Sequence, residues 1–476
     1  MAHRDLMLAY AMAAFLGGCS TLPYTSRPID PEAAAASYQA RSVDAEGLKA
    51  FAVANGYDAA QWPPAQWGLQ ELTLAALYFH PDIRMARARA AVARAELGSA
   101  SSAPPWSARL APEYHSRQLP EDKAPWSLGL QLEIPLVAQS KKAARVERGT
   151  FLSDAADLDV ADAAWIARAR VRDSYMELAA SGEALALIDA QLQARDQLQA
   201  LVARRVEAGL ASAQDLGIER LVVSQLGLLR GQQAARRQRA QGELAAALGL
   251  PLDVVERMSI RTEVREDTGV MLDAATLQRL ALRNRLDVHR KLLEFGAADA
   301  EVKAAVAAQN PEITLGPGYA WDQGDNVWSL AVGFTLPSGQ ARAGVREAQA
   351  RRELAAESFA AIQAGAISAA QRAAAQVRQA RDRVDAASRQ LQLQREQEAR
   401  IARQFDSGAA DRVQRVGARL ETLAAETVLQ AARVEQSRAT AGLEDAIQRP
   451  LLGDFRQLPD VRVAPATALA NTAGTP

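Results

Sequence analysis

Apolar and polar residues alternate strictly in four short segments of the chain, and this is the period of a β-strand. One face of each segment carries leucine, isoleucine, valine, phenylalanine and aromatic side chains, and the opposite face carries small, polar or charged residues. The segments form two strand pairs, at 106–134 and 312–336, and Pro135 or Pro337 follows each pair. The individual strands are expected at residues 106–115, 126–134, 312–321 and 328–336.

A long proline-free stretch follows each strand pair and predicts a helical hairpin. Both stretches are rich in Ala, Leu, Gln, Arg and Glu, which favour helices. Gly209 and Gly408 each lie in the single break of their stretch. At ~1.5 Å per residue, an outgoing helix over 140–206 or 340–405 would be about 100 Å long, which indicates a fibrous or tubular role. The hairpins are expected at 138–250 and 339–449, and shorter helical patterns precede the strands at 69–98 and 273–308.

The two halves of the chain are an internal duplication. The segment from Leu110 to Tyr114 matches the segment from Leu315 to Tyr319, 205 positions later. Trp126 matches Trp328 at a shift of 202, and the shift changes only where loops or turns are expected. A period of this length indicates a duplicated domain-scale unit and not a solenoid. The expected order is a tether at 19–68 with little regular structure, repeat 1 at 69–250, a linker at 251–272, repeat 2 at 273–450 and a flexible tail at 451–476.

The N-terminus predicts a signal peptide over residues 1–18. Its apolar run from Leu6 to Leu16 is too short to span a bilayer, for which ~20 residues are needed, but suits an export signal. Leu16-Gly-Gly-Cys19 resembles a bacterial lipobox, which predicts acylation of Cys19. Ser20 follows the cysteine and predicts sorting to the outer membrane. The alternative is a free cysteine in an ordinary export signal.

The alternating strands favour a membrane β-barrel over a half-buried sheet of a soluble protein. Their apolar faces are almost unbroken, and aromatic residues lie near their ends, as in strands that contact lipid on one side and water on the other. Pro112 and Pro317 each remove one ladder donor, which predicts a bulge. An aromatic girdle is expected from Trp106, Tyr114, Trp126, Tyr319, Trp321 and Trp328.

Four strands cannot close a barrel, so the pattern requires several chains. Open sheet edges are not tolerated in lipid, and the smallest membrane barrels have about eight strands. Two chains would supply eight strands, and three would supply twelve, enough to leave a pore.

Composition excludes several other classes of protein. The formal net charge of −1 gives no basic field for nucleic acid. One cysteine and four scattered histidines provide neither a disulfide framework nor a metal site. No nucleophile–histidine–carboxylate grouping or phosphate-binding loop appears, so we expect no enzyme and no cofactor.

The pattern over 69–450 resembles the TolC family of outer-membrane efflux proteins. The resemblance implies an α+β membrane protein: a homotrimer with a twelve-stranded outer-membrane barrel, continued by a helical barrel of coiled-coil hairpins in the periplasm. It also implies a periplasmic adaptor and an inner-membrane pump, of the RND type, as partners. The segments 126–135 and 315–330 are similar to the cobalt–zinc–cadmium subgroup.

The hairpin turns resemble the family's tip motif, a glycine followed after five residues by Asp-Leu. Gly209 with Asp215-Leu216 fits it, whereas Gln414 replaces the acid in the second repeat. The resemblance implies a gate at the tips, either an acidic ring or contacts of Asp215 with Arg412 or Arg415. The matching positions for adaptor docking are Ala208, Gly209, Leu210, Ser407, Gly408 and Ala409.

Two functions therefore remain from different classes. The first is a passive efflux channel for heavy-metal cations or drugs, gated at its periplasmic tip. The alternative is a lipid-anchored coiled-coil spacer without channel activity, which accounts for the helices but not for the duplicated strands.

Overall fold

A computed structural model describes residues 24–116, 124–261, 273–335 and 339–451 of the chain. The signal peptide, Cys19, Pro337 and residues 452–476 lie outside the described residues. The chain divides into two compact units, residues 1–41 and 42–476. In the first unit, helix α2 (Pro31–Gln39) begins where the Asp30 side chain accepts hydrogen bonds from two backbone N–H groups.

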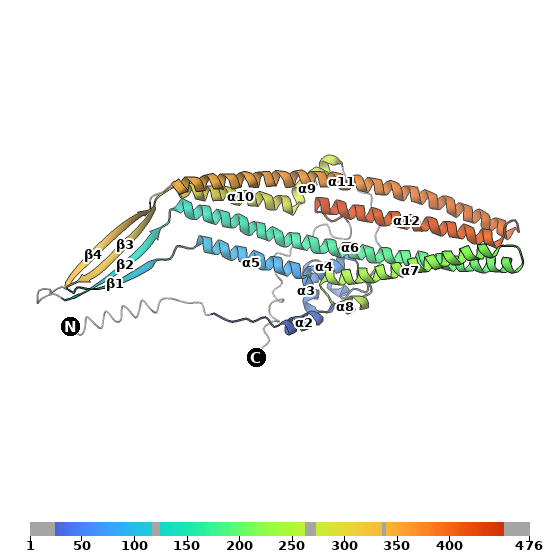
Figure 1. The fold of residues 1–476 in the computed structure, drawn as a ribbon, viewed down its shortest axis with the longest axis horizontal. Helices are drawn as coiled ribbons and strands as arrows, with labels where there is room; N and C mark the ends of the chain where they lie inside the picture. Colours follow the sequence, from blue (N-terminus) through green and yellow to red (C-terminus); the bar gives the residue numbers. More distant parts are fainter. Residues whose placement is uncertain (1–23, 117–123, 262–272, 336–338, 452–476) are drawn as a thin grey trace. The chain divides into compact units, whose positions relative to one another are not determined.

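Two helical hairpins make up most of the second unit (Figure 1). The outgoing helices α6 (Gln139–Glu207) and α11 (Gly339–Asp406) have 69 and 68 residues, and the returning helices α7 (Ala213–Leu248) and α12 (Arg412–Ile447) have 36 each. The four helices lie within the hairpin ranges 138–250 and 339–449 that the sequence suggested. Gly209 and Gly408 adopt φ values of +72° and +78°, which favour glycine and reverse the chain. Capping boxes then start α7 and α12.

A four-stranded antiparallel sheet lies at the opposite end of the helices from these turns (Figure 1). Its order is β1 (Ser107–Tyr114), β2 (Trp126–Leu136), β3 (Glu312–Asp322) and β4 (Asp325–Thr335). The expected number of four strands is confirmed, but β2 continues one residue beyond Pro135 and β4 begins three residues before the expected start at Trp328. The central pair joins the two repeats, because β2 pairs with β3.

The duplication is visible in the shorter helices. Repeat 1 has α4 (Leu69–Phe79) and α5 (Pro81–Ser101), and repeat 2 has α9 (Ala274–Asn284) and α10 (Leu286–Ala307). Each pair is broken by one extended residue, His80 or Arg285, at positions 205 apart. The returning helices also end alike, since Gly249 and Gln448 both have positive φ.

The segment before Leu69 is more structured than the sequence predicted. It contains α3 (Glu46–Ala54) and the short 3-10 helix η1 (Ala59–Gln61), and Trp67 bridges to Ile260. Leu48, Phe51 and Ala52 are buried in clusters shared with α4, α5 and α6. Tertiary packing therefore orders a stretch whose local composition suggested a loose tether. Helix α8 (Leu252–Arg257) likewise lies within the expected linker.

Alanine forms much of the core along the hairpins. Around α6, helix α7 packs on one side and α12 on the other, and α11 packs against α12. Nearer the sheet, α5 and α10 flank α6, and α11 packs against α10. Buried alanines such as Ala370, Ala374 and Ala441 allow these close approaches. Among the described residues, no helix combines the length and hydrophobicity needed to cross a bilayer.

Candidate functional site

The register of the sheet collects the apolar positions of all four strands on one face. Leu130 is the partner of Leu110 in β1 and of Tyr319 in β3, and Tyr319 is the partner of Trp328 in β4. Partners on adjacent strands share a face, so the alternation predicted strand by strand becomes one continuous surface. This apolar face comprises Ala108, Leu110, Pro112, Tyr114, Trp126, Leu128, Leu130, Leu132, Ile134, Leu136, Ile313, Leu315, Pro317, Tyr319, Trp321, Trp328, Leu330, Val332 and Phe334. Asn326, the partner of Trp321, is a polar residue on the same face and accepts a hydrogen bond from the Tyr319 hydroxyl at 2.6 Å.

The apolar face is exposed in the single chain. The side chains of Trp328, Leu330 and Phe334 on β4 are 80%, 68% and 64% exposed. A contiguous apolar surface of this kind marks contact with lipid or with another protein. The sheet therefore requires an apolar environment on this side.

The opposite, polar face carries paired charges near the helices. Ser107 donates a hydrogen bond to Glu133 at 3.0 Å, and Arg109 lies 3.9 Å from the same carboxylate. Lys141, at the start of α6, forms an ion pair with Glu312 at 3.0 Å, which ties the sheet to the helices. Polar and small side chains on this face suit contact with water.

The two prolines lie on the apolar face without the bulges that we expected. Pro112 is the partner of Leu128, and Pro317 is the partner of Leu330, with an unchanged register on both sides. Between β2 and β3 the pairing is interrupted beside Pro317 and resumes at Leu315 in the same register. Pro317 is therefore accommodated by a local gap in the pairing with β2, whereas Pro112 lies in the outer strand β1, whose pairing with β2 is continuous.

The aromatic residues expected to form a girdle cluster mainly at the hairpin end of the sheet, where β1–β2 and β3–β4 connect. Tyr114 packs on Trp126 with ring centroids 4.9 Å apart, and Tyr319 packs on Trp328 at 4.8 Å. Trp321 lies in the same region of the register, opposite Leu128. Trp106 precedes β1 at the helical end and is 68% exposed.

At the hairpin tips, an ion pair joins the two repeats. Arg205, in the last turn of α6, lies 2.5 Å from Asp411, which caps α12. The pKa of Asp411 is lowered, first by the backbone N–H of Gln414 and then, against partial burial, by Arg205. The sequence did not single out this pair, because two charged residues near a turn are typical of any solvated helix end.

The predicted gate residues do not meet within one chain. Asp215 accepts hydrogen bonds from the backbone and side chain of Ser212, which lower its pKa. The guanidinium of Arg415 lies over the ring of Phe405, 4.9 Å from its centroid. Contacts of Asp215 with Arg412 or Arg415 across the hairpins thus stay a prediction. The expected docking positions are exposed at both turns: Ala208, Gly209, Leu210, Ser407, Gly408 and Ala409.

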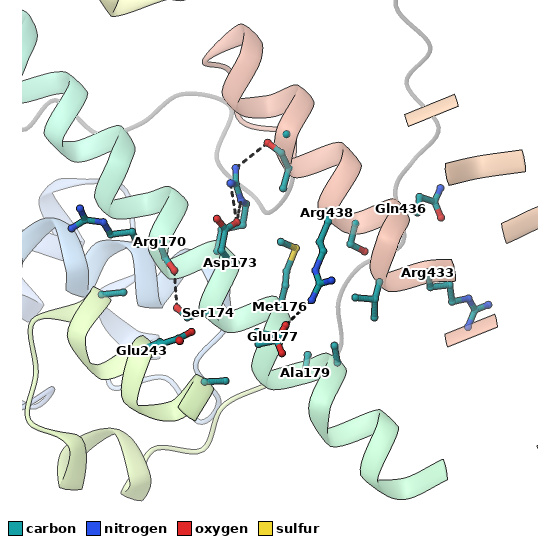
Figure 2. A pocket seen from close by; sticks show the side chains of 18 of the residues that line it. Arg170, Asp173, Ser174, Met176, Glu177, Ala179, Glu243, Arg433, Gln436 and Arg438 are labelled. Carbon is teal, nitrogen blue, oxygen red and sulfur yellow. Dashed lines mark hydrogen bonds and ion pairs between the residues drawn. The ribbon is translucent and has the colours of Figure 1, made fainter. Parts of the chain in front are cut away.

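A groove of about 1160 Å³ lies where α7 and α12 flank α6 (Figure 2). Glu177 of α6 forms ion pairs with Arg236 of α7 and, at 2.7 Å, with Arg438 of α12. Burial raises the pKa of Glu177, but the two arginines outweigh it and hold the pKa below its usual value. One carboxylate thus connects three helices across the floor of the groove.

A buried charge cluster beside this groove also escaped the sequence analysis. Arg168 and Arg172 of α6 are each 1% exposed, and both contact Glu444 of α12, which is fully buried, at 2.6 and 3.1 Å. Arg172 also pairs with Asp445 at 2.7 Å. The available signal was weak: two arginines spaced i, i+4 on an otherwise apolar helix face.

Comparison with known proteins identifies the fold. No protein-family model matches the sequence, and no curated protein matches it either. Several solved structures are similar to this chain. The outer membrane protein VceC of Vibrio cholerae has 19% sequence identity and a TM-score of 0.66, and the match covers 80% of this chain and 95% of VceC. The outer-membrane channel OprN has 21% identity and a TM-score of 0.66, with 90% and 99% covered. The CmeC outer membrane channel of Campylobacter jejuni has 15% identity and a TM-score of 0.66, with 90% and 93% covered.

At these identities the likeness establishes the fold alone. The chain has the α+β fold of outer-membrane channels, with a four-stranded sheet continued by two long helical hairpins. The α+β fold of the single chain that the TolC resemblance implied is therefore confirmed.

Proposed function

We propose that this protein is the outer-membrane channel of a tripartite efflux system and exports its substrates passively. The observation that carries the proposal is the register of the sheet, which gives one face that is apolar apart from Asn326 and one polar face. A wall with these two faces separates lipid from water. The fold shared with VceC, OprN and CmeC supports the same conclusion.

Closure of the barrel is assigned to a homotrimer. In the strand order, β1 and β4 are the outer strands and each has one edge without a partner among the described strands. Such edges do not persist in lipid, so neighbouring copies pair β1 with β4. Three copies give about twelve strands, a number that leaves a water-filled pore.

The remaining assignments extend the proposal along the chain. After removal of residues 1–18, acylated Cys19 anchors the protein in the outer membrane, and the helical hairpins extend into the periplasm. The exposed turns around Gly209 and Gly408 dock a periplasmic adaptor, which connects the channel to an inner-membrane RND pump. The similarity to the cobalt–zinc–cadmium subgroup favours heavy-metal cations as cargo, with drugs as the alternative.

The ion pair between Arg205 and Asp411 is proposed to hold the tip closed. It links the α6–α7 hairpin to the α11–α12 hairpin, so separation of the hairpins must break it. The adaptor and pump would shift the closed and open populations by stabilising the separated state.

The coiled-coil spacer is less consistent with these observations. A periplasmic spacer would expose the apolar face of the sheet to water, and nothing in such a role requires two-faced strands. No catalysis is proposed, and the structural neighbours named above are channel or outer membrane proteins.

The proposal is tested by oligomeric mass and single-channel conductance of the purified, lipidated protein. The wild type is expected to be a trimer of low conductance in planar bilayers. Arg205→Ala removes the link between hairpins and is expected to raise the open probability by about tenfold, because an exposed ion pair contributes about 0.5 kcal/mol in each of three copies. A monomer without conductance would instead support the spacer.

Arg195→Ala is the matched control for the gate. Arg195 pairs with Glu219 at 3.1 Å, but both belong to the α6–α7 hairpin, so this change leaves the link between hairpins intact. Equal conductance of the two variants would contradict the assigned role of Arg205.

A further inference from the structure

The first turns of the two outgoing helices carry basic residues where acidic ones are favoured. Lys142 is the fourth residue of α6 and Arg342 is the fourth residue of α11, and neither helix has an acidic residue in its first turn. By contrast, α5, α7 and α10 each have an aspartate in their first turn. The partial positive charge at a helix N-terminus disfavours cations there, so these basic residues do not stabilise their own helices.

A second basic residue follows about one turn later in each helix. Arg145 of α6 and Arg346 of α11 are exposed, as is Arg342, and Lys142 is half-buried. Within the part of the chain that the structure describes, the side chains of these four residues have no ion pair or hydrogen bond. Their positive charges are therefore available to a partner outside the chain.

The acidic residues at this level of the helices already have cationic partners. Glu312 of β3 pairs with Lys141 at 3.0 Å, and Glu147 of α6 pairs with Lys303 of α10 at 2.7 Å. Glu347 of α11 likewise pairs with an arginine one turn further along the same helix. No nearby carboxylate within the described chain is thus left to neutralise the four basic residues.

These basic residues lie where the apolar face of the sheet ends and the helices begin (Figure 1). Leu136, the last residue of β2, belongs to that face and is 47% exposed, and Lys142 follows it by six positions. At ~1.5 Å per residue, the first two turns of α6 extend about 10 Å from the sheet. The headgroup region on one side of a bilayer is about 5–8 Å thick. With the apolar face in the hydrocarbon, the basic residues therefore lie at the depth of the headgroups.

We infer that Lys142, Arg145, Arg342 and Arg346 bind the phosphate groups of anionic phospholipids in the leaflet of the outer membrane that faces the periplasm. The inference rests on the proposed function, because the apolar face must contact lipid for these residues to reach headgroups. Lysine and arginine form charge-assisted hydrogen bonds with phosphate oxygens, and anionic lipids attract basic residues next to a membrane-embedded segment. Because both repeats carry such residues, these contacts fix the depth of the barrel on more than one side.

Lipid retention by the purified, full-length trimer tests this inference. Native mass spectrometry, with phosphatidylglycerol or phosphatidylcholine added in detergent, measures how many lipids of each kind stay bound. The wild type is expected to prefer phosphatidylglycerol by about fivefold or more, the effect of one basic residue near an anionic surface. The fourfold variant should lose this preference; it combines Lys142→Gln, Arg145→Gln, Arg342→Gln and Arg346→Gln.

The matched control removes four basic residues that lie well away from the sheet. These are Arg220 and Arg237 of α7 and Arg378 and Arg389 of α11, all of which are exposed. Their replacement by glutamine changes the net charge equally but should leave the preference for phosphatidylglycerol intact. Exchange of lysine for arginine, and of arginine for lysine, at the four inferred positions should also preserve it.

Variants of one helix at a time keep the test decisive where the fourfold variant does not assemble. Lys142→Gln with Arg145→Gln, or Arg342→Gln with Arg346→Gln, should each lose about half of the bound phosphatidylglycerol. An undiminished preference in these variants, or displacement of the lipid by inorganic phosphate, would overturn the inference while the trimer and its conductance persist. A wild type that forms neither a trimer nor a pore would overturn the proposed function as well.

Discussion

His80 caps helix α5 as a neutral imidazole. Its Nδ1 accepts a hydrogen bond from the backbone N–H of Asp82 at 3.2 Å, and the residue is 4% exposed. Burial is the main cause of a lowered pKa; the charge of Asp82 opposes the shift and that of Arg170 adds to it. A proton on Nδ1 would remove the acceptor, so the cap requires the neutral form.

The lowered pKa of His80 predicts a loss of stability in mild acid. The folded protein binds this proton less readily than the unfolded chain, whose histidine has a pKa near 6.5. Its contribution is therefore present above pH 6.5 and is lost as the pH falls towards the folded pKa, by at most about 1.4 kcal/mol per pH unit. His80→Asn keeps a capping oxygen. Its melting temperature, measured by circular dichroism, should change less between pH 7 and pH 5 than that of the wild type. The same slope in His80→Asn and in His289→Asn would contradict this role.

The contacts of single residues were harder to predict from the sequence than the helices and strands. Pro112 and Pro317 suggested bulges, but Pro112 lies in an outer strand with continuous pairing, and Pro317 needs only a gap in its pairing with β2. The hydrogen bonds that link His115, Ser127 and Asp322 depend on the pairing of neighbouring strands, and Ser127 and Asp322 are 195 residues apart in sequence.

At the scale of elements, α6 and α12 are joined by buried charges and not only by alanine packing. Glu444 of α12 accepts from Arg168 and Arg172 of α6 and, at 2.9 Å, from the backbone N–H of Leu451. Burial lowers the pKa of Arg172, but Asp445, Asp173 and Glu444 outweigh it and raise the pKa above its usual value. The two repeats are therefore connected at mid-length by groups that must stay charged together.

Removing one charge from this cluster should be costly. Glu444→Gln leaves two buried guanidinium groups without their shared carboxylate and should lower the free energy of unfolding by about 3–5 kcal/mol, measured by guanidinium titration of helical circular dichroism. Glu435→Gln is the matched control. Glu435 is a more exposed residue of α12 that pairs with Arg383 of α11, so this substitution should lower the free energy of unfolding by at most about 1 kcal/mol. Equal losses in the two variants would show that the buried cluster has no special role.

Helices and strands were predicted well where the local sequence determines the secondary structure. The absence of proline and one left-handed glycine per hairpin were sufficient for α6, α7, α11 and α12. Helix α3 was missed, because its order comes from burial of Leu48 and Phe51 against distant helices.

At the scale of the whole molecule, the two faces of the sheet decide where the protein resides. Leu330 is central in β4 on the apolar face, and its neighbour Ser329 lies on the polar face. Leu330→Arg is expected to cost about 2–4 kcal/mol per copy in lipid and to reduce heat-resistant trimers in outer-membrane fractions. Ser329→Arg, the matched control, should assemble normally. Normal assembly of both variants would contradict lipid contact by the apolar face.

The assembled state could be argued from the sequence only by counting strands. Alternation predicts strands with one apolar and one polar face, and the duplication predicts four such strands per chain. Pairing between copies would involve the outer edges of β1 and β4, which have no partner within the described strands of one chain. The arrangement of the trimer therefore remains a proposal.

Those outer edges of β1 and β4 also have a consequence for biogenesis. Between secretion and assembly, each newly made copy would expose the unpaired edges of β1 and β4 and the apolar face of the sheet to water. A barrel completed within one polypeptide pairs such edges as it folds, whereas in the proposed homotrimer they stay unpaired until two further copies bind. Its yield therefore depends on local synthesis rate and on holdase chaperones that shield unassembled copies.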